Sequence, residues 1–214
     1  MKSMWMTGKK NRIGYIDLTD GLRVTATESN VTVEGYVKDA PVVHPENSIE
    51  LVAKTMRNFQ TDSAAVVDST HQLLGGVLLS ALFSGIISRH ELHGTVASRM
   101  NGNFVTADPN DELQKIQALN IESGLTEFPV FHKKRRVGII SWRDLIGSLR
   151  VGSVFAHITI EDVMTPEMVT IAPVEPISHA AKLLVKHNIS RLPVIKGETL
   201  VGILDQHDIL AALA

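Results

Sequence analysis

The amino-acid sequence predicts an α+β fold made of tandem β-α-β-β-α repeats. The first observation is self-similarity: when the 214-residue chain is shifted by 64 positions, Pro45 falls on Pro109 and then on Pro173. The second is a shared order of patterns in each copy, namely a β-branched run, a helical pattern and two apolar runs joined by a turn. The third is size, because a copy of about 55 residues is too small to bury both faces of its sheet alone. We therefore expect the copies to pack against one another.

Each copy opens with a strand and a helix. The β-branched runs Val105-Thr106 and Val169–Ile171 predict short strands, and the Pro that follows each run suits the start of a helix. Apolar residues then recur at the i, i+3, i+4, i+7 spacing of a helix that buries one face. They are Ile177, Ala180, Ala181 and Leu184 in the third copy and Ile49, Val52, Ala53 and Met56 in the first.

A hairpin and a closing helix complete each copy. In the third copy, residues 192–195 and 200–204 read as strands around a turn that contains the permissive residue Gly197. The closing helix is expected to begin near Asp208. In the first copy the hairpin falls at residues 64–68 and 73–79, but Leu82 replaces the equivalent Asp, so we expect that copy to be structural.

The N-terminal segment matches the back half of a further copy. Residues 13–22 align with residues 201–210, which places Asp17 and Asp20 on the third copy's two Asp positions. Residues 4–6 and 12–16 would form its hairpin with Gly8 in the turn, and no leading strand or helix precedes them. The predicted domains are a partial copy at residues 1–30 and copies at 31–93, 94–150 and 151–214.

The composition argues against several classes of function. A formal net charge of −2 gives no long-range positive field to hold nucleic acid. The absence of cysteine removes disulfides, zinc ribbons and thiol nucleophiles, and it fits a cytoplasmic protein. The uncharged stretch at residues 73–87 is shorter than the roughly 20 residues of a membrane span. We expect no nucleic acid and no membrane among the partners.

Two further patterns carry no additional chemistry. The basic run at residues 133–136 lies between two predicted strands, which indicates a solvated hairpin turn. His90 and His93 stand at i and i+3 on a possible helix, without the i, i+4 spacing of a zinc-hydrolase helix. No arrangement of Ser, His and Asp suggests a nucleophile, so we expect neither a metal site nor a catalytic residue.

The third copy resembles the cystathionine β-synthase (CBS) domain family at residues 162–166, 169–171, 189–195 and 200–204. With the other copies and the N-terminal segment, the resemblance covers almost the whole chain. It implies repeats paired about pseudo-twofold axes as Bateman modules, with two clefts per pair, and it implies a regulatory protein that is not an enzyme. The architecture is distantly similar to the gamma subunit of AMP-activated protein kinase.

The resemblance also implies the ligands and partners. Adenosyl compounds are the family's usual ligands, here AMP, ADP, ATP or S-adenosylmethionine acting as a regulatory ligand with no required cofactor. A homodimer or another protein would be the partner.

The resemblance implies a ligand site in the second copy. In the family, a Gly, two apolar residues, Ser or Thr, two more residues and Asp bind the ribose, and residues 138–144 match this motif. Asp144 would accept hydrogen bonds from the ribose hydroxyls and Ser141 would contact the ribose or phosphate. The base would lie among Thr106, Ala107, Phe128 and Pro129. The residues alone leave a second interpretation open, in which Asp144 only N-caps the closing helix.

The third copy carries an altered form of the same site. Asp208 is in place, but Asp205 replaces the Ser, and two carboxylates three residues apart disfavour an anionic ligand tail. The slot would be formed by Thr170, Ile171, Leu192 and Pro193. Arg191 either reaches the phosphate of a ligand in the second copy or lies at the rim over apolar surface. Its counterpart in the second copy is Glu127.

Two hypotheses follow. In the first, the chain is a regulatory module that binds an adenosyl ligand between paired repeats and transmits its level to a partner. In the second, the clefts are empty and the repeats serve as a dimerisation or interaction scaffold. The ribose motif separates the hypotheses, since it is intact in the second copy, altered in the third and absent from the first.

Overall fold

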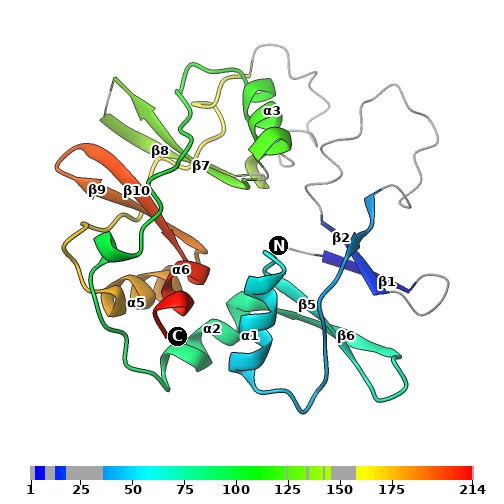
Figure 1. Cartoon of the computed structure of the whole chain (residues 1–214). Helices are drawn as coiled ribbons and strands as arrows, with labels where there is room; N and C mark the ends of the chain where they lie inside the picture. Colours follow the sequence, from blue (N-terminus) through cyan, green and yellow to red (C-terminus); the bar gives the residue numbers. More distant parts are fainter. Residues whose placement is uncertain are drawn as a thin grey trace, which may run out of the picture. The chain divides into compact units, whose positions relative to one another are not determined.

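The computed structural model describes residues 3–7, 13–17, 36–123, 125–133, 135–141, 143–145 and 158–213. The chain forms two compact units. Unit 1 takes residues 1–94, 176–190 and 205–214, and unit 2 takes residues 95–175 and 191–204. Both contain helices and small sheets, which confirms the predicted α+β class (Figure 1).

The first copy folds in unit 1 as its patterns predict. Strand β4 (Val42–Val43) runs parallel to β5 (Ser63–Val67), which pairs antiparallel with β6 (Leu73–Leu78). Helix α1 (Ile49–Asn58) begins after Ser48, whose Oγ accepts a hydrogen bond from the Leu51 N–H at 3.2 Å. Helix α2 (Leu79–Ile87) follows β6 directly. The predicted helix at Ile49 and the predicted hairpin are confirmed.

The N-terminal hairpin is also confirmed. Strands β1 (Ser3–Thr7) and β2 (Ile13–Asp17) pair antiparallel, and β3 (Lys38–Asp39) adds to β2. Ile13 is buried in one cluster with Ala65 and Val67 of β5, so the hairpin packs on the first copy. The predicted turn at Gly8, and Asp20 with its closing helix, lie outside the described residues.

Two helices of the third copy also belong to unit 1. Helix α5 (Ile177–His187) buries the four residues predicted from the spacing and ends at Asn188, which adopts the left-handed conformation at φ 51°. Helix α6 (Gln206–Leu210) begins two residues before the expected Asp208 and runs into the 3₁₀ turn η5 (Ala211–Leu213). Helix α2 contacts α5 and α6 as well as α1, so helices of the first and third copies pack together in unit 1.

Unit 2 holds the sheets of the second and third copies. After the 3₁₀ turn η4 (Val96–Ser98) and helix α3 (Leu113–Ser123), strands β7 (Glu127–His132) and β8 (Arg135–Ser141) form one antiparallel hairpin. Strands β9 (Arg191–Lys196) and β10 (Thr199–Asp205) form the other, and Gly197 takes the predicted turn at φ 63°. Asp205, the last residue of β10, is assigned to unit 1.

The leading strands of these two copies are shorter than predicted. Instead of strands at Val105-Thr106 and Val169–Ile171, only Ala107 and Ile171 make bridges, which are parallel to Val130 and Val194. Each segment meets its neighbouring strand at a single residue, so the β-branched pattern alone overestimated the pairing.

Within unit 2, the lead segment of each copy, which stands ahead of its first predicted strand, pairs with the hairpin of the other copy. Thr165 in the lead segment of the third copy bridges Ile139 of β8, and Asn101 in that of the second copy bridges Ile203 of β10. The two bridges are related by the 64-residue register, so the copies are paired reciprocally. Gly138 is required at one crossing, because an added Cβ would collide with the carbonyl oxygen of Thr165.

Candidate functional site

The residues predicted for the second-copy site all lie in unit 2. They are Thr106, Ala107, Phe128, Pro129, Ser141 and Asp144. Unit 2 also holds part of the third-copy set, namely Thr170, Ile171, Arg191, Leu192 and Pro193. Asp205 and Asp208 belong to unit 1. The second-copy site can therefore be described within one unit.

Ser141 and Asp144 form a local hydrogen-bonded pair at the end of β8. The backbone N–H and the hydroxyl of Ser141 both donate to Oδ2 of Asp144, at 2.7 and 2.8 Å. Residues 143–145 are helical, so Asp144 lies within the helix and not ahead of it. The alternative interpretation, in which Asp144 is itself the N-cap, is therefore wrong, and its carboxylate instead reaches back to the N–H of the residue three positions earlier.

The third copy shows the same local geometry around α6. The side chain of Asp205 accepts from the Asp208 N–H at 2.9 Å, and Asp208 Oδ2 accepts from the Asp205 N–H at 2.9 Å. This is a complete capping box. In the second copy only Oδ2 of Asp144 takes part, and no donor among the described residues reaches Oδ1. Helix capping and ligand binding by Asp144 are thus compatible.

Glu127 brings a second carboxylate to Ser141. It lies directly opposite Ser141 in the β7–β8 hairpin, so both side chains project from the same face of the sheet. Burial raises the pKa of Glu127, whereas the charges of Arg191 and Arg143 act in the opposite direction and the charge of Asp144 adds to the rise. The Glu127 carboxylate opposite Ser141 is therefore influenced by the charges of Arg191, Arg143 and Asp144.

The predicted wall of the base pocket is built on a short backbone contact. Ala107 donates its N–H to the carbonyl of Pro129 at 3.0 Å and accepts from Phe131 at 2.9 Å. Ala107, Phe128 and Pro129 are buried, with Phe128 only 1% exposed, whereas Thr106 is exposed. Thr106 is thus the member of this set whose side chain is open to a ligand.

The third copy repeats this contact in unit 2. Ile171 donates to Pro193 at 3.1 Å and accepts from Ile195 at 2.8 Å. Leu192 is fully buried and Thr170 is half-buried. The two predicted slots therefore share one local framework.

Arg136 adds a cation that was not assigned from the sequence. Its Nη1 donates to Oγ1 of Thr170 at 2.8 Å, joining β8 of the second copy to the predicted slot of the third. The basic run at residues 133–136 was expected to be a solvated turn, and Lys133 is an exposed turn residue with φ 46°. Arg136 is exposed as expected, but it lies within β8 and not in the turn, and its side chain contacts a residue 34 positions away.

In unit 1, the two carboxylates of the third copy lie beside a histidine. His207 Nε2 is 2.8 Å from Oδ1 of Asp62, which precedes β5. Burial raises the pKa of Asp208 to about 6, and the charge of Asp205 adds to this rise. Burial alone would lower the pKa of His207, but its hydrogen bond to Asp62 and the surrounding carboxylates raise it above the usual value. Asp208 and His207 therefore each hold a proton more tightly than an isolated side chain does.

Other candidate features can be placed briefly. His90 and His93 follow α2 and do not lie on a helix, contrary to expectation, and His93 Nε2 is 3.5 Å from exposed Glu91. In the described part of the chain, no group of three or more His, Asp or Glu side chains is arranged to hold a metal ion. None of the described helices is both long and apolar enough to span a membrane.

Comparison with known proteins identifies a family. The model of the CBS domain matches residues 94–151 and 160–214, which together make up more than half of the chain. The uncharacterized protein MJ1426 of Methanocaldococcus jannaschii is 27% identical over 184 residues, which cover 85% of this chain and 90% of that protein.

Other curated relatives are considerably longer than the matched region. The chain spans 51% of an uncharacterized 33.4 kDa protein of Thermofilum pendens, at 26% identity and over 65% of this chain. It spans 24% of the uncharacterized protein YtoI of Bacillus subtilis, at 34% identity and over 51% of this chain. A homoserine O-acetyltransferase of Methanococcoides burtonii matches at 30% identity over 27% of its length and 62% of this chain.

Solved structures show the same fold. Protein MJ1225 of Methanocaldococcus jannaschii, described as a candidate archaeal homologue of g-AMPK, superposes with a TM-score of 0.81 at 17% identity, covering 98% of this chain and 86% of that one. The CBS domain pair of MJ0100, in complex with 5′-methylthioadenosine and S-adenosyl-L-methionine, gives 0.51 at 27% identity, covering 56% and 100%. CBSX2 in complex with AMP gives 0.50 at 25% identity, covering 56% and 96%.

Proposed function

Because this chain belongs to the CBS domain family, we propose that it is a regulatory module that binds an adenosyl ligand at the second-copy site and signals its level to a partner protein. The observation that carries the proposal is that one carboxylate oxygen of Asp144 accepts no hydrogen bond from the described residues. Its Oδ2 is occupied by Ser141, whereas no described donor reaches Oδ1, which leaves an acceptor for ribose hydroxyls. The related pairs crystallised with AMP or with S-adenosyl-L-methionine support this ligand class.

Each residue of the site has a proposed role. The ribose hydroxyls donate to Asp144, and the base lies against Thr106 and the backbone at Ala107 and Pro129. Arg191 is proposed to face the 5′ end of the ligand, since the family resemblance implies a basic residue against the phosphate, and its charge also acts on Glu127 opposite Ser141. No cofactor or catalytic group is needed for this function, so the module is not proposed to be an enzyme.

A second slot is proposed in the third copy, within unit 2. Thr170, Ile171, Leu192 and Pro193 would form this slot. Asp205 and Asp208 belong to unit 1, where they form the capping box of α6. Arg136 already lies on Thr170 and would meet any ligand that enters this slot.

Ligand binding at the second-copy site can reach a partner through the exchanged segment. Thr165 is paired with Ile139 by two backbone hydrogen bonds of 2.9 Å, and Ile139 lies on β8 two residues before Ser141. A ligand that holds Ser141 and Asp144 would stabilise this crossing. Regulation requires that a homodimer or another partner protein bind the liganded and free states unequally.

Thermal denaturation with AMP, ADP, ATP, S-adenosylmethionine and 5′-methylthioadenosine tests the proposal. A ligand at 100 times its dissociation constant should raise the free energy of unfolding by about 2.7 kcal/mol. Asp144→Asn should remove most of this stabilisation. Absence of any shift with all five ligands would favour the interaction scaffold.

Asp162 offers a matched control for the loss of the carboxylate. It accepts from the N–H and Oγ1 of Thr159 at 2.9 and 2.8 Å, the same geometry that Asp144 makes with Ser141, but it is exposed and outside the proposed site. Asp162→Asn should therefore weaken the local turn without changing ligand binding. An equal loss of binding in both variants would contradict the role of Asp144.

A further inference from the structure

We propose that Glu127 makes the second-copy site selective for adenosyl ligands whose 5′ group is neutral or cationic, such as a thioether or a sulfonium, over nucleoside phosphates. This inference rests on the proposed function and names the ligand class of that site. It follows from the position of Glu127, from its burial and from the charges around it.

The position of Glu127 places a carboxylate next to the ribose-binding pair. Glu127 and Ser141 are directly paired in the β7–β8 hairpin, and such partners have Cβ atoms about 4.5–5.5 Å apart on the same face. The Ser141 hydroxyl donates to Asp144 at 2.8 Å. Ser141 therefore lies between two acidic side chains, and a ligand held by Asp144 extends along this face toward Glu127.

The charges indicate which end of the ligand Glu127 meets. Among the surrounding charges, that of Arg191 acts most strongly on Glu127, followed by those of Arg143 and Asp144. Arg191 is the residue expected to face the 5′ end of the ligand. Glu127 and Arg191 therefore occupy the same region, and the carboxylate offsets the cation that would otherwise attract a phosphate.

Partial burial makes this offset effective. Glu127 is half-buried in β7, and burial raises its pKa, so repulsion between like charges is screened less there than at a fully exposed site. A phosphate that recruited Arg191 would leave a half-buried carboxylate without its compensating charge, which is unfavourable. A neutral 5′ group leaves the Glu127–Arg191 interaction intact, and a cationic group gains an additional carboxylate.

The test compares the affinities of three ligands by isothermal titration calorimetry. The ligands are AMP, 5′-methylthioadenosine, which is uncharged at its 5′ end, and S-adenosylmethionine, which carries a sulfonium. The native protein should bind the last two at least about tenfold more tightly than AMP. Glu127→Gln should reduce this preference about tenfold, mainly by improving AMP binding.

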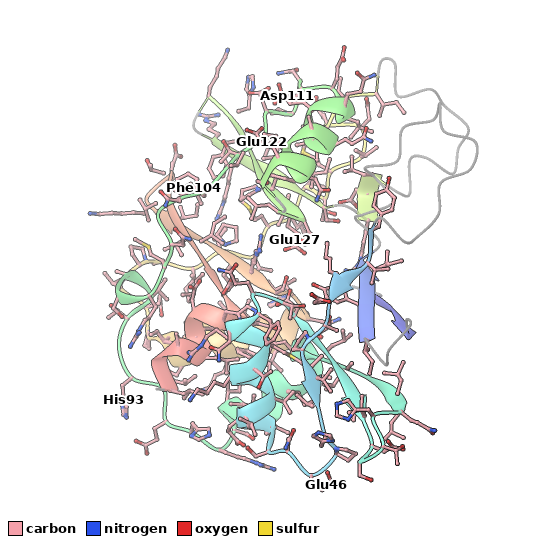
Figure 2. All side chains as sticks on the ribbon, turned by 45° about the vertical axis from the view of Figure 1, so that its right-hand side comes forward. Glu46, His93, Phe104, Asp111, Glu122 and Glu127 are labelled. Atoms are coloured by element: carbon pink, nitrogen blue, oxygen red, sulfur yellow. The ribbon has the colours of Figure 1, made fainter. Side chains whose placement is uncertain are left out.

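Glu122→Gln is the matched control. Glu122 is an exposed residue on α3 in the same unit, and Figure 2 marks both glutamates. Its substitution removes the same charge from the molecule, so it should leave the ligand preference unchanged. A similar change in both variants would show a general charge effect and would overturn the role of Glu127.

The remaining outcomes separate this inference from the proposed function. If the native protein binds AMP as tightly as 5′-methylthioadenosine, or more tightly, the selectivity is wrong while the adenosyl site stands. If none of the three ligands binds, both proposals are wrong. The comparison of ligands on the native protein does not depend on the folding of any variant.

Discussion

Ile139 and Thr165 exchange both of their backbone hydrogen bonds, each 2.9 Å long, although they belong to different copies of the repeat. At the equivalent positions, Asn101 and Ile203 do the same at 2.8 and 2.9 Å. Each hairpin in unit 2 is thus extended by the segment that leads into the other copy. This reciprocal pairing joins the hairpins of two copies, each too small to be stable alone, within unit 2.

Substitution of Gly138 tests the tightness of this crossing. Gly138→Ala should lower the free energy of unfolding by about 1–3 kcal/mol, because the new Cβ would collide with the backbone oxygen of Thr165. Gly75→Ala in β6 is the control, since nothing lies within 4 Å of its added Cβ. Urea denaturation measures both, and equal effects would contradict the close approach.

The contact between Arg136 and Thr170 should be measurable as a coupling between two copies. A double-mutant cycle with Arg136→Ala and Thr170→Ala should give an interaction energy of about 0.5–1 kcal/mol, the usual size for a partly exposed hydrogen bond. Arg135→Ala, at the neighbouring exposed position, should show no coupling to Thr170→Ala. A zero coupling for Arg136 would mean that the contact is not formed in solution.

The raised pKa of Asp208 should make the protein more stable in mild acid than at neutral pH. Folding raises this pKa from 3.8 to about 6, so the folded state favours the protonated carboxyl. As the pH rises above about 4, ionisation of Asp208 increasingly favours the unfolded state. Asp208→Asn should therefore be stabilising at pH 7.5, with the difference from the native protein vanishing below about pH 4. The pKa shift sets an upper bound of about 3 kcal/mol on the gain in the free energy of unfolding. Because Asp205 and Asp208 are only half-buried, solvent screening reduces the expected gain to about 1 kcal/mol. A pH-independent difference would contradict the raised pKa.

His207 should contribute stability that is lost as the pH rises. Because its pKa in the folded state is above the usual value, the charged form is favoured by folding. The contribution is fully present below the unfolded-state pKa of about 6.5 and disappears as the pH rises through the folded-state value. His207→Gln should thus be more destabilising at pH 5.5 than at pH 8.5 in chemical denaturation. Asp62→Asn should flatten the same pH dependence, since it removes the carboxylate 2.8 Å from Nε2.

Local patterns were sufficient for the helices and hairpins. The spacing of Ile177, Ala180, Ala181 and Leu184 predicted α5, and all four residues are buried. The turn at Gly197 was predicted because a two-strand pattern flanks a residue that tolerates positive φ. The strands expected at Val105-Thr106 and Val169–Ile171 shrank to single bridges, because pairing depends on a neighbouring strand and not on β-branching alone.

Local sequence patterns predicted only part of the candidate site. Ser141 and Asp144 lie three residues apart, so their association follows from the chain itself, and their role in ligand binding stays a prediction. The 64-residue register showed that an acidic residue, Glu127, stands where the next copy has the basic Arg191. It did not show that Glu127 lies opposite Ser141 with a raised pKa, because this depends on burial and on the pairing of β7 with β8.

The sequence by itself determined the repeat, its order of elements and the family to which it belongs, because these depend on periodicity and on residues close together in the chain. Only the tertiary structure decided that lead segments are exchanged between copies, that Arg136 lies on Thr170, and that His207 is paired with Asp62. Those contacts join residues 26 to 145 positions apart, and their formation depends on how the copies pack rather than on any local preference of the chain.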